Sequence, residues 1–284
     1  MMGAIIGDIV GSVYEWHNIK TKEFPLFRDD CFFTDDTVMT VAVAEALMNG
    51  AKRGDFIDAM KKYGRMYPLA GYGNKFASWL SSDDRRPYNS FGNGSAMRVS
   101  PCAWGVDRCS ADGTGIPWEK CRAAAKLSAA VTHNHPEGTK GAMATADAIL
   151  LSRYYFGGRD GDDAFPTDID HNECKRRIRK YIERAYGYDL SLHLDEIRPN
   201  YTFDESCQGT VPQAIIAFLE STDFEDAIRN AISLGGDSDT LAAITGSIAE
   251  AAYGISSDIK DKALRYLDPP LADVIERWNK RGLR

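Results

Sequence analysis

Apolar residues recur at the three- and four-residue spacing of helices through most of this chain. Glycine and proline, at Gly50, Pro68 and in the segment 70–73, mark helix ends. Pro212 is expected near the first turn of its helix. No segment alternates Val, Ile or Thr in the manner of a strand. The pattern predicts an all-α fold with helices over 3–16, 37–48, 54–66, 74–81, 118–131, 138–156, 171–186, 207–220, 223–234, 239–253, 257–267 and 271–281.

Two segments place hydroxyl groups and paired acids at the start of strongly apolar helices. One is Thr34-Asp35-Asp36-Thr37, and the other is Asp237-Ser238-Asp239-Thr240 after two glycines. A single Asp is a good helix N-cap, so capping is one explanation. A second carboxylate in so apolar a segment adds repulsion and a desolvation cost that capping does not offset. We therefore favour a cation site over paired N-caps.

The chemistry of these two segments points to a particular class of metal. Hydroxyl and carboxylate oxygens are hard ligands, and neither segment contains Cys or His. Such ligands favour Mg²⁺ or Mn²⁺ over Zn²⁺. Because the two segments together offer four carboxylates, two metal ions are expected.

The N-terminal segment carries a stripe of glycines at i, i+4 and i+8, namely Gly3, Gly7 and Gly11. Each glycine costs a helix about 1 kcal/mol relative to alanine, so the stripe indicates that another backbone packs very close. A polar line of Asp8, Ser12 and Glu15 runs beside it. Spacing alone leaves open whether this line faces solvent or a site, and Asp8 could be purely structural.

A glycine-punctuated loop at 90–98 leads into an apolar segment. Such a loop can bring backbone N–H groups close to a phosphate, although Asn-Gly pairs also mark ordinary turns. Arg98 within it is either a phosphate contact or a buried structural partner. His133 and His135 could bind a metal, but we favour His133 as a pocket residue. The segment 71–76 is a further pocket edge or simply core packing.

Composition narrows the class of protein. The chain has 284 residues, 44% of them hydrophobic, which suits one large domain over 1–284. Its net charge of -7 argues against general binding to nucleic acids or anionic membranes. The six cysteines are scattered without a Cys-x-x-Cys pair, as in a protein of a reducing cytoplasm. No signal peptide or membrane-spanning run is evident, and the segment 157–163 is expected to be a solvated acidic loop.

Taken together, the motifs resemble one family. The chain is similar to the ADP-ribosylglycohydrolases in carrying, in this order, Gly7-Asp8 with Gly11-Ser12 and Glu15, Thr34-Asp35-Asp36-Thr37, the run from Gly92 to Arg98, Thr132-His133 and Gly235-Gly236-Asp237-Ser238-Asp239-Thr240. These motifs span residues 3 to about 254, nearly the whole chain.

The resemblance implies a compact all-α domain with two Mg²⁺ or Mn²⁺ ions, and Asp239 would bridge them. The implied metal ligands are Thr34, Asp35, Asp36, Asp237, Asp239 and Thr240. The implied substrate contacts are Gly73, Asn74, Ser90, Phe91, Gly92, Asn93, Gly94 and His133, and the implied catalytic residues are Glu15 and Asp36. Phe91, expected beside the adenosine, stands where some relatives have Tyr, so a hydroxyl contact is missing there.

The activity implied by the resemblance is hydrolysis of the glycosidic bond between ADP-ribose and a modified protein side chain, of the arginine or serine type. Two alternatives remain: hydrolysis of a small conjugate such as O-acetyl-ADP-ribose, and an inactive ADP-ribose-binding relative. We expect a cytoplasmic monomer whose partner is the ADP-ribosylated protein or conjugate.

Overall fold

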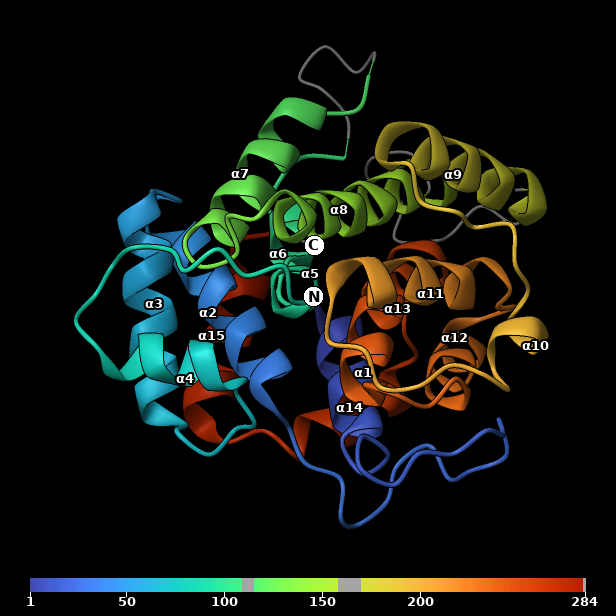
Figure 1. The fold of residues 1–284 in the computed structure, drawn as a ribbon, viewed down its shortest axis with the longest axis horizontal. Helices are drawn as coiled ribbons and strands as arrows, with labels where there is room; N and C mark the ends of the chain where they lie inside the picture. The colour runs from blue at the N-terminus through green and yellow to red at the C-terminus, as the bar shows by residue number, and fades with distance from the viewer. Residues whose placement is uncertain (109–114, 158–169, 283–284) are drawn as a thin grey trace.

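A computed structural model describes residues 1–108, 115–157 and 170–282. The described residues form helices and no strand, apart from one isolated antiparallel bridge between Gly92 and Ser206, so the all-α prediction is confirmed. The helices are α1 (Met2–Gly11), α2 (Asp35–Asn49), α3 (Arg53–Met66), α4 (Asn74–Ser81), α5 (Gly94–Met97), α6 (Ser100–Trp104), α7 (Trp118–Ala130), α8 (Pro136–Phe156), α9 (His171–Tyr186), α10 (Leu194–Ile197), α11 (Cys207–Leu219), α12 (Phe224–Ser233), α13 (Ser238–Tyr253), α14 (Ser257–Leu264) and α15 (Pro269–Lys280) (Figure 1).

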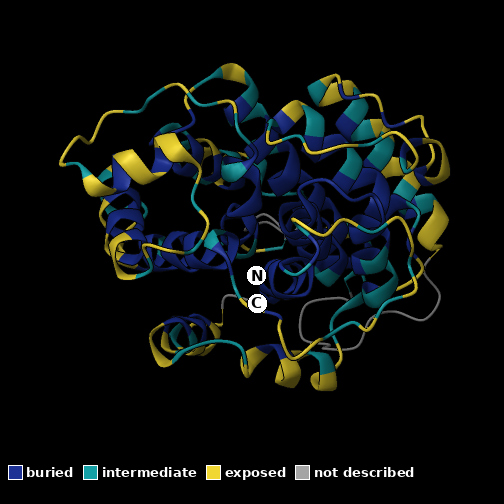
Figure 2. Cartoon of the chain, turned by 60° about the horizontal axis from the view of Figure 1, so that its bottom comes forward, coloured by how far each residue is buried: buried dark blue, intermediate teal, exposed yellow. Residues whose placement is uncertain are grey.

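Helices α1 and α13 run antiparallel through the middle of the molecule. All ten residues of α1 are buried, and α13 is surrounded by α1, α8, α11 and α12. Figure 2 shows these inner helices as buried, with exposed positions on the outer helices and loops. The glycine stripe explains the close approach, since a Cβ on Gly7 would lie 2.1 Å from the carbonyl oxygen of Ala242. The predicted backbone contact is therefore confirmed.

The predicted helix boundaries differ from the structure in a few places. Helix α1 ends at Gly11 rather than at residue 16, because the chain turns there and the Tyr14 amide donates to the Gly11 carbonyl at 2.8 Å. Pro212 lies inside α11, beyond its first turn. The short helices α5, α6 and α10 were not predicted, because four or five residues cannot display a helical period. Most of the predicted acidic loop, 158–163, lies outside the described residues.

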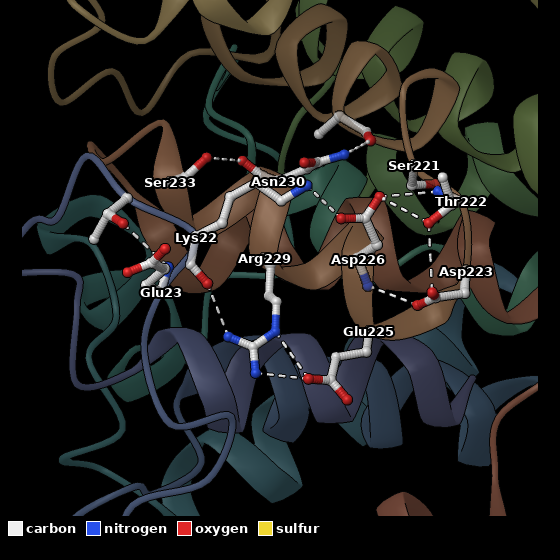
Figure 3. Close-up of polar contacts among 12 residues, drawn as sticks. Lys22, Glu23, Ser221, Thr222, Asp223, Glu225, Asp226, Arg229, Asn230 and Ser233 are labelled. Atoms are coloured by element: carbon white, nitrogen blue, oxygen red, sulfur yellow. Dashed lines mark hydrogen bonds and ion pairs between the residues drawn. The ribbon is translucent and has the colours of Figure 1, made fainter.

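The long segment between α1 and α2 is fastened to α12. Arg229 donates to the carbonyl oxygen of Lys22 at 2.9 Å, and its guanidinium pairs with Glu225 (Figure 3). Arg229 also donates to the carbonyl oxygen of Phe24 at 2.6 Å. The Lys22 ammonium pairs with Asp226. These contacts fix residues 22–24 of this segment against α12.

Within the described ranges, no helix is long and apolar enough to cross a membrane. The five cysteines described there are buried and reduced.

Candidate metal centre

Carboxylates from α1, α2 and α13 converge where these helices meet. Oxygens of Asp8, Asp36 and Asp239 all lie within 4.8 Å of one another, and so do oxygens of Glu15, Asp237 and Asp239. Asp239 belongs to both groups. The four aspartates are at most 6% exposed, whereas Glu15 is half-buried. Three segments, at residues 8–15, at the start of α2 and at the start of α13, therefore form one acidic centre made of two groups of carboxylates that share Asp239.

Asp8 organises the start of α2. Its carboxylate accepts hydrogen bonds from the Thr34 amide at 2.9 Å, the Thr34 hydroxyl at 2.6 Å and the Thr37 amide at 3.0 Å. The polar line on α1 thus faces the interior, and the solvent-facing alternative is excluded for Asp8 and Ser12, which are both buried. Spacing alone left the role of Asp8 open. Its position next to Gly7, on the closely packed stripe, was the signal for burial.

Asp36 presents an unused oxygen to the centre. Its Oδ2 accepts from the Thr240 hydroxyl at 3.2 Å, and the Thr34 hydroxyl lies 3.4 Å away. Its Oδ1 is buried and has no hydrogen-bond partner among the residues that the structure describes. A buried carboxylate oxygen without a partner is costly, and a cation among the three carboxylates would satisfy it.

Asp35 lies at the margin of the centre. It is half-buried and belongs to neither group of converging oxygens. Its amide donates to the Ala70 carbonyl at 2.7 Å, and its Oδ1 is 3.5 Å from where a Cβ on Gly71 would stand. The structure thus gathers Asp36, Asp237 and Asp239 with the two threonines nearby, and places Asp35 toward the 70–73 loop.

The start of α13 tests the capping explanation directly. Asp237 occupies the N-cap position of α13 but makes no side-chain cap hydrogen bond. Its Oδ2 instead accepts from the Asn93 amide at 2.7 Å. Gly235 and Gly236 precede it with φ of +69° and +72°, the left-handed conformation that glycine adopts without strain. Asp237 therefore faces the centre because of the turn, and capping does not account for it.

Electrostatics favour a cation at this centre. Burial, and next the charge of Asp239, raises the pKa of Asp8 to about 7 and that of Glu15 to about 8. The same causes raise the pKa values of Asp36 and Asp237 well above the usual range. No lysine or arginine in the described part of the chain pairs with these acids. The N-termini of α2 and α13 supply only partial positive charge, so hard divalent cations fit the donor set.

The glycine loop lies against the centre. Asn93 is buried, and its amide group bridges Asp237 and the Thr210 hydroxyl, 3.0 Å away, so its side chain serves the centre rather than the surface. A Cβ on Gly94 would lie 3.3 Å from His133 Nε2, and one on Gly92 would lie 3.6 Å from it. Burial lowers the pKa of His133 well below its ordinary value, so the ring is neutral. The 90–94 loop and His133 therefore lie side by side at one edge of the acidic centre.

The other predicted substrate contacts lie farther out. Ser90 is half-buried and accepts from the Gly92 amide at 3.1 Å, while Phe91 is exposed with its ring edge-on to His135. Gly73 and Asn74 are exposed at the start of α4, where Asn74 lines a cavity of about 400 Å³ with Trp79 and Tyr88. That cavity lies beside α4 and contains none of the converging acids.

The structure gives structural roles to Arg98 and His135, whose roles the sequence left open. Arg98 is buried and donates to the Ser128 carbonyl and the Thr132 hydroxyl, so it is a structural partner of the residues beside His133. The ring nitrogen of His135 caps α8 by accepting from the Glu137 amide. Asn18, which sequence reasoning missed, bonds both the Glu15 carbonyl and Gly236.

Comparison with known protein families identifies the family of this chain. The sequence profile of the ADP-ribosylglycohydrolases matches residues 1–283. The chain belongs to the ADP-ribosylglycohydrolase family. The resemblance stated from the motifs is therefore confirmed, and membership supports hydrolase activity toward ADP-ribose linkages.

Individual relatives agree with the family match. ADP-ribosylhydrolase ARH3 of Mus musculus is 27% identical, over 90% of this chain and 83% of the relative. ADP-ribosylarginine hydrolase Tri1 of Pseudomonas putida (strain GB-1) is 26% identical, over 90% of this chain and 70% of the relative. A solved structure described as an ADP-ribosylglycohydrolase-related protein complex shares the fold, with a TM-score of 0.62 at 22% identity, covering 96% of this chain and 93% of that one.

Proposed function

We propose that this protein is a divalent-metal-dependent hydrolase that releases ADP-ribose from a modified protein side chain. The observation that carries the proposal is the pair of three-carboxylate clusters that share Asp239. These clusters are largely buried, no cationic side chain pairs with them in the described part of the chain, and the chain belongs to this family. The names of the relatives, ADP-ribosylhydrolase and ADP-ribosylarginine hydrolase, support the substrate class.

The ligands of the two proposed metal ions come from both clusters. Asp36, Asp239, Thr34 and Thr240 would hold one ion beside Asp8, and Asp237 and Asp239 would hold the other beside Glu15, with Asp35 at the margin. When bound, Mg²⁺ or Mn²⁺ would supply Lewis-acid activation of the attacking water and positive charge for the ribose hydroxyls.

The residues of the chain account for the remaining requirements of the reaction. The bond between the anomeric carbon and the acceptor breaks, the water oxygen bonds to that carbon, and a water proton passes to the acceptor. The transition state has oxocarbenium character, which the surrounding carboxylates stabilise. Glu15 is half-buried and its carboxylate converges with Asp237 and Asp239, so it is the candidate for holding or transferring the proton. Asp36, the other proposed catalytic residue, lies in the cluster that does not contain Glu15 and would orient the reacting groups from there.

Binding of the ADP-ribose is assigned to the loops around the centre. The pyrophosphate would lie against Gly73-Asn74 and the 90–94 loop, with His133 beside that loop and Phe91 at the adenosine end. Of these residues, Asn93 is bonded directly to the centre through Asp237, and His133 lies against Gly92 and Gly94. Because the acids are intact and converge, an inactive binding relative is disfavoured.

Two substitutions test the proposal. Asp239→Ala should abolish ADP-ribose release and weaken Mn²⁺ binding, because both clusters lose their shared carboxylate. Glu15→Gln should keep ADP-ribose affinity, measured by calorimetry, yet lose rate. Full activity in Asp239→Ala would refute the centre, and an unchanged rate in Glu15→Gln would remove Glu15 from the mechanism.

A further inference from the structure

Two aromatic side chains stack on each other at the outer edge of the acidic centre. Trp16 is 73% exposed and Phe203 is 39% exposed. Their ring centroids lie 5.3 Å apart, with an angle of 22° between the planes. Single exposed aromatic rings are common on protein surfaces, but two rings stacked beside buried acids form one contiguous apolar face next to a charged site. We call this pair the aromatic platform.

The platform is tied to the catalytic side of the centre. Trp16 directly follows Glu15, whose carboxylate lies in the centre. That carboxylate converges with Asp237 and Asp239. The platform therefore stands next to the proposed proton-transfer group, where the acceptor side of a glycosidic bond must lie.

Both halves of the platform are held by the glycine turn that carries Asp237. The Asn18 amide nitrogen donates to the carbonyl oxygens of Glu15 and Gly236, each at 2.9 Å. A Cβ on Gly236 would lie 2.8 Å from the ring of Tyr201 and 2.9 Å from the Thr202 carbonyl oxygen. The residues preceding Phe203 thus pack directly on this turn, so the platform is preorganised relative to the acids.

The charge around the platform is negative. Glu205 is exposed and close enough to raise the pKa of Glu15, and Asp204 adjoins Phe203. The ammonium of Lys20, four residues after Trp16, is engaged by the backbone carbonyls of Tyr201 and Leu234. Flat aromatic faces beside carboxylates bind a guanidinium well, because it stacks on rings while its N–H groups face the acids.

We propose that the aromatic platform receives the guanidinium of an arginine acceptor, so that this protein prefers ADP-ribosylarginine to serine-linked or acetyl-linked conjugates. This inference rests on the proposed function and adds the acceptor class. A serine acceptor offers neither a cation nor a flat group to stack, so it gains nothing from the platform.

The test compares two peptides of one sequence, ADP-ribosylated on arginine or on serine, with the full-length Mn²⁺-loaded protein. The wild type should favour the arginine-linked peptide in kcat/KM. Trp16→Ala and Phe203→Ala should each lower kcat/KM for that peptide about five- to thirtyfold. Neither should change the serine-linked rate in the same proportion, and the inhibition constant of free ADP-ribose should stay within about twofold of the wild type.

Two further variants separate stacking from other effects. Trp16→Phe keeps an aromatic face, so kcat/KM for the arginine-linked peptide should stay within about threefold of the wild type. Tyr154→Ala removes an aromatic ring as exposed as Phe203, but on α8 and away from the centre, and should match the wild type.

Three results would overturn the proposal. Preference of the wild type for the serine-linked peptide would refute the acceptor class while leaving the proposed function intact. Equal weakening of ADP-ribose inhibition in Trp16→Ala would show that the platform stacks on the adenine instead. Absence of release from every conjugate would refute the proposed function as well.

Discussion

Replacing Gly7 by alanine tests how the fold builds the centre. A Cβ there would lie 2.1 Å from the Ala242 carbonyl oxygen, whereas ordinary contact begins near 3.4 Å, so α1 and α13 would have to separate by roughly 1.3 Å. Overpacking of this kind costs about 1–3 kcal/mol, and the backbone partner puts this case at the upper end. The better helix propensity of alanine recovers only about 1 kcal/mol. We expect a net loss of about 2 kcal/mol.

The loss should appear in thermal unfolding followed by circular dichroism. For a chain of this size, about 2 kcal/mol corresponds to a fall in Tm of about 4–8 °C. Because Asp8 is the next residue, displacement of α1 should also weaken the stabilisation by Mn²⁺. Gly54→Ala is the matched control, since its Cβ would meet only Arg85 at 3.7 Å, and it should unfold at or above the wild-type Tm. A Gly7→Ala protein as stable as the wild type would refute the packing argument.

Three further predictions concern the centre itself. Asp36→Asn should lose most of the rise in Tm that Mn²⁺ causes, because it removes a ligand charge; a wild-type rise would exclude Asp36 as a ligand. In the folded protein the pKa values of Asp8 and Glu15 are raised to about 7 and about 8, so both acids bind a proton more tightly there than in the unfolded chain. The stability that this proton binding contributes is fully present below the unfolded pKa near 4 and is lost as pH rises through 7–8. In metal-free protein Tm should therefore fall between pH 6 and 8.5, and a flat profile would contradict the assignment. Asn18→Ala should lower kcat while the protein stays folded, because the turn carrying Glu15 is released from Gly236; unchanged kcat would show that this link is dispensable.

The sequence predicted the long helices well, because each has an apolar face repeated over several turns. It also predicted both acidic segments, since paired carboxylates beside apolar runs have few structural uses. The position of Asp8 was left open because spacing cannot distinguish a polar line that faces solvent from one that faces another helix. The contact between Gly7 and Ala242 decides that question, and it joins opposite ends of the chain.

Other parts of the site depend on long-range packing in a similar way. The aromatic platform pairs Trp16 with Phe203, two residues in irregular segments that carry no periodic signal. Asn93 stays a predicted substrate contact, and its side-chain amide also holds Asp237 in place, which the sequence did not indicate. Only the folded chain shows which hydrogen bonds a buried amide satisfies.

The most direct test of the central claim is release of free ADP-ribose from arginine-, serine- and acetyl-linked conjugates, measured with Mg²⁺ or Mn²⁺ and again with a chelator. We predict release that requires the metal, is lost with the chelator and returns when Mn²⁺ is restored. Release that is unaffected by the chelator would contradict the metal centre, and tight ADP-ribose binding without release from any conjugate would contradict the hydrolase function.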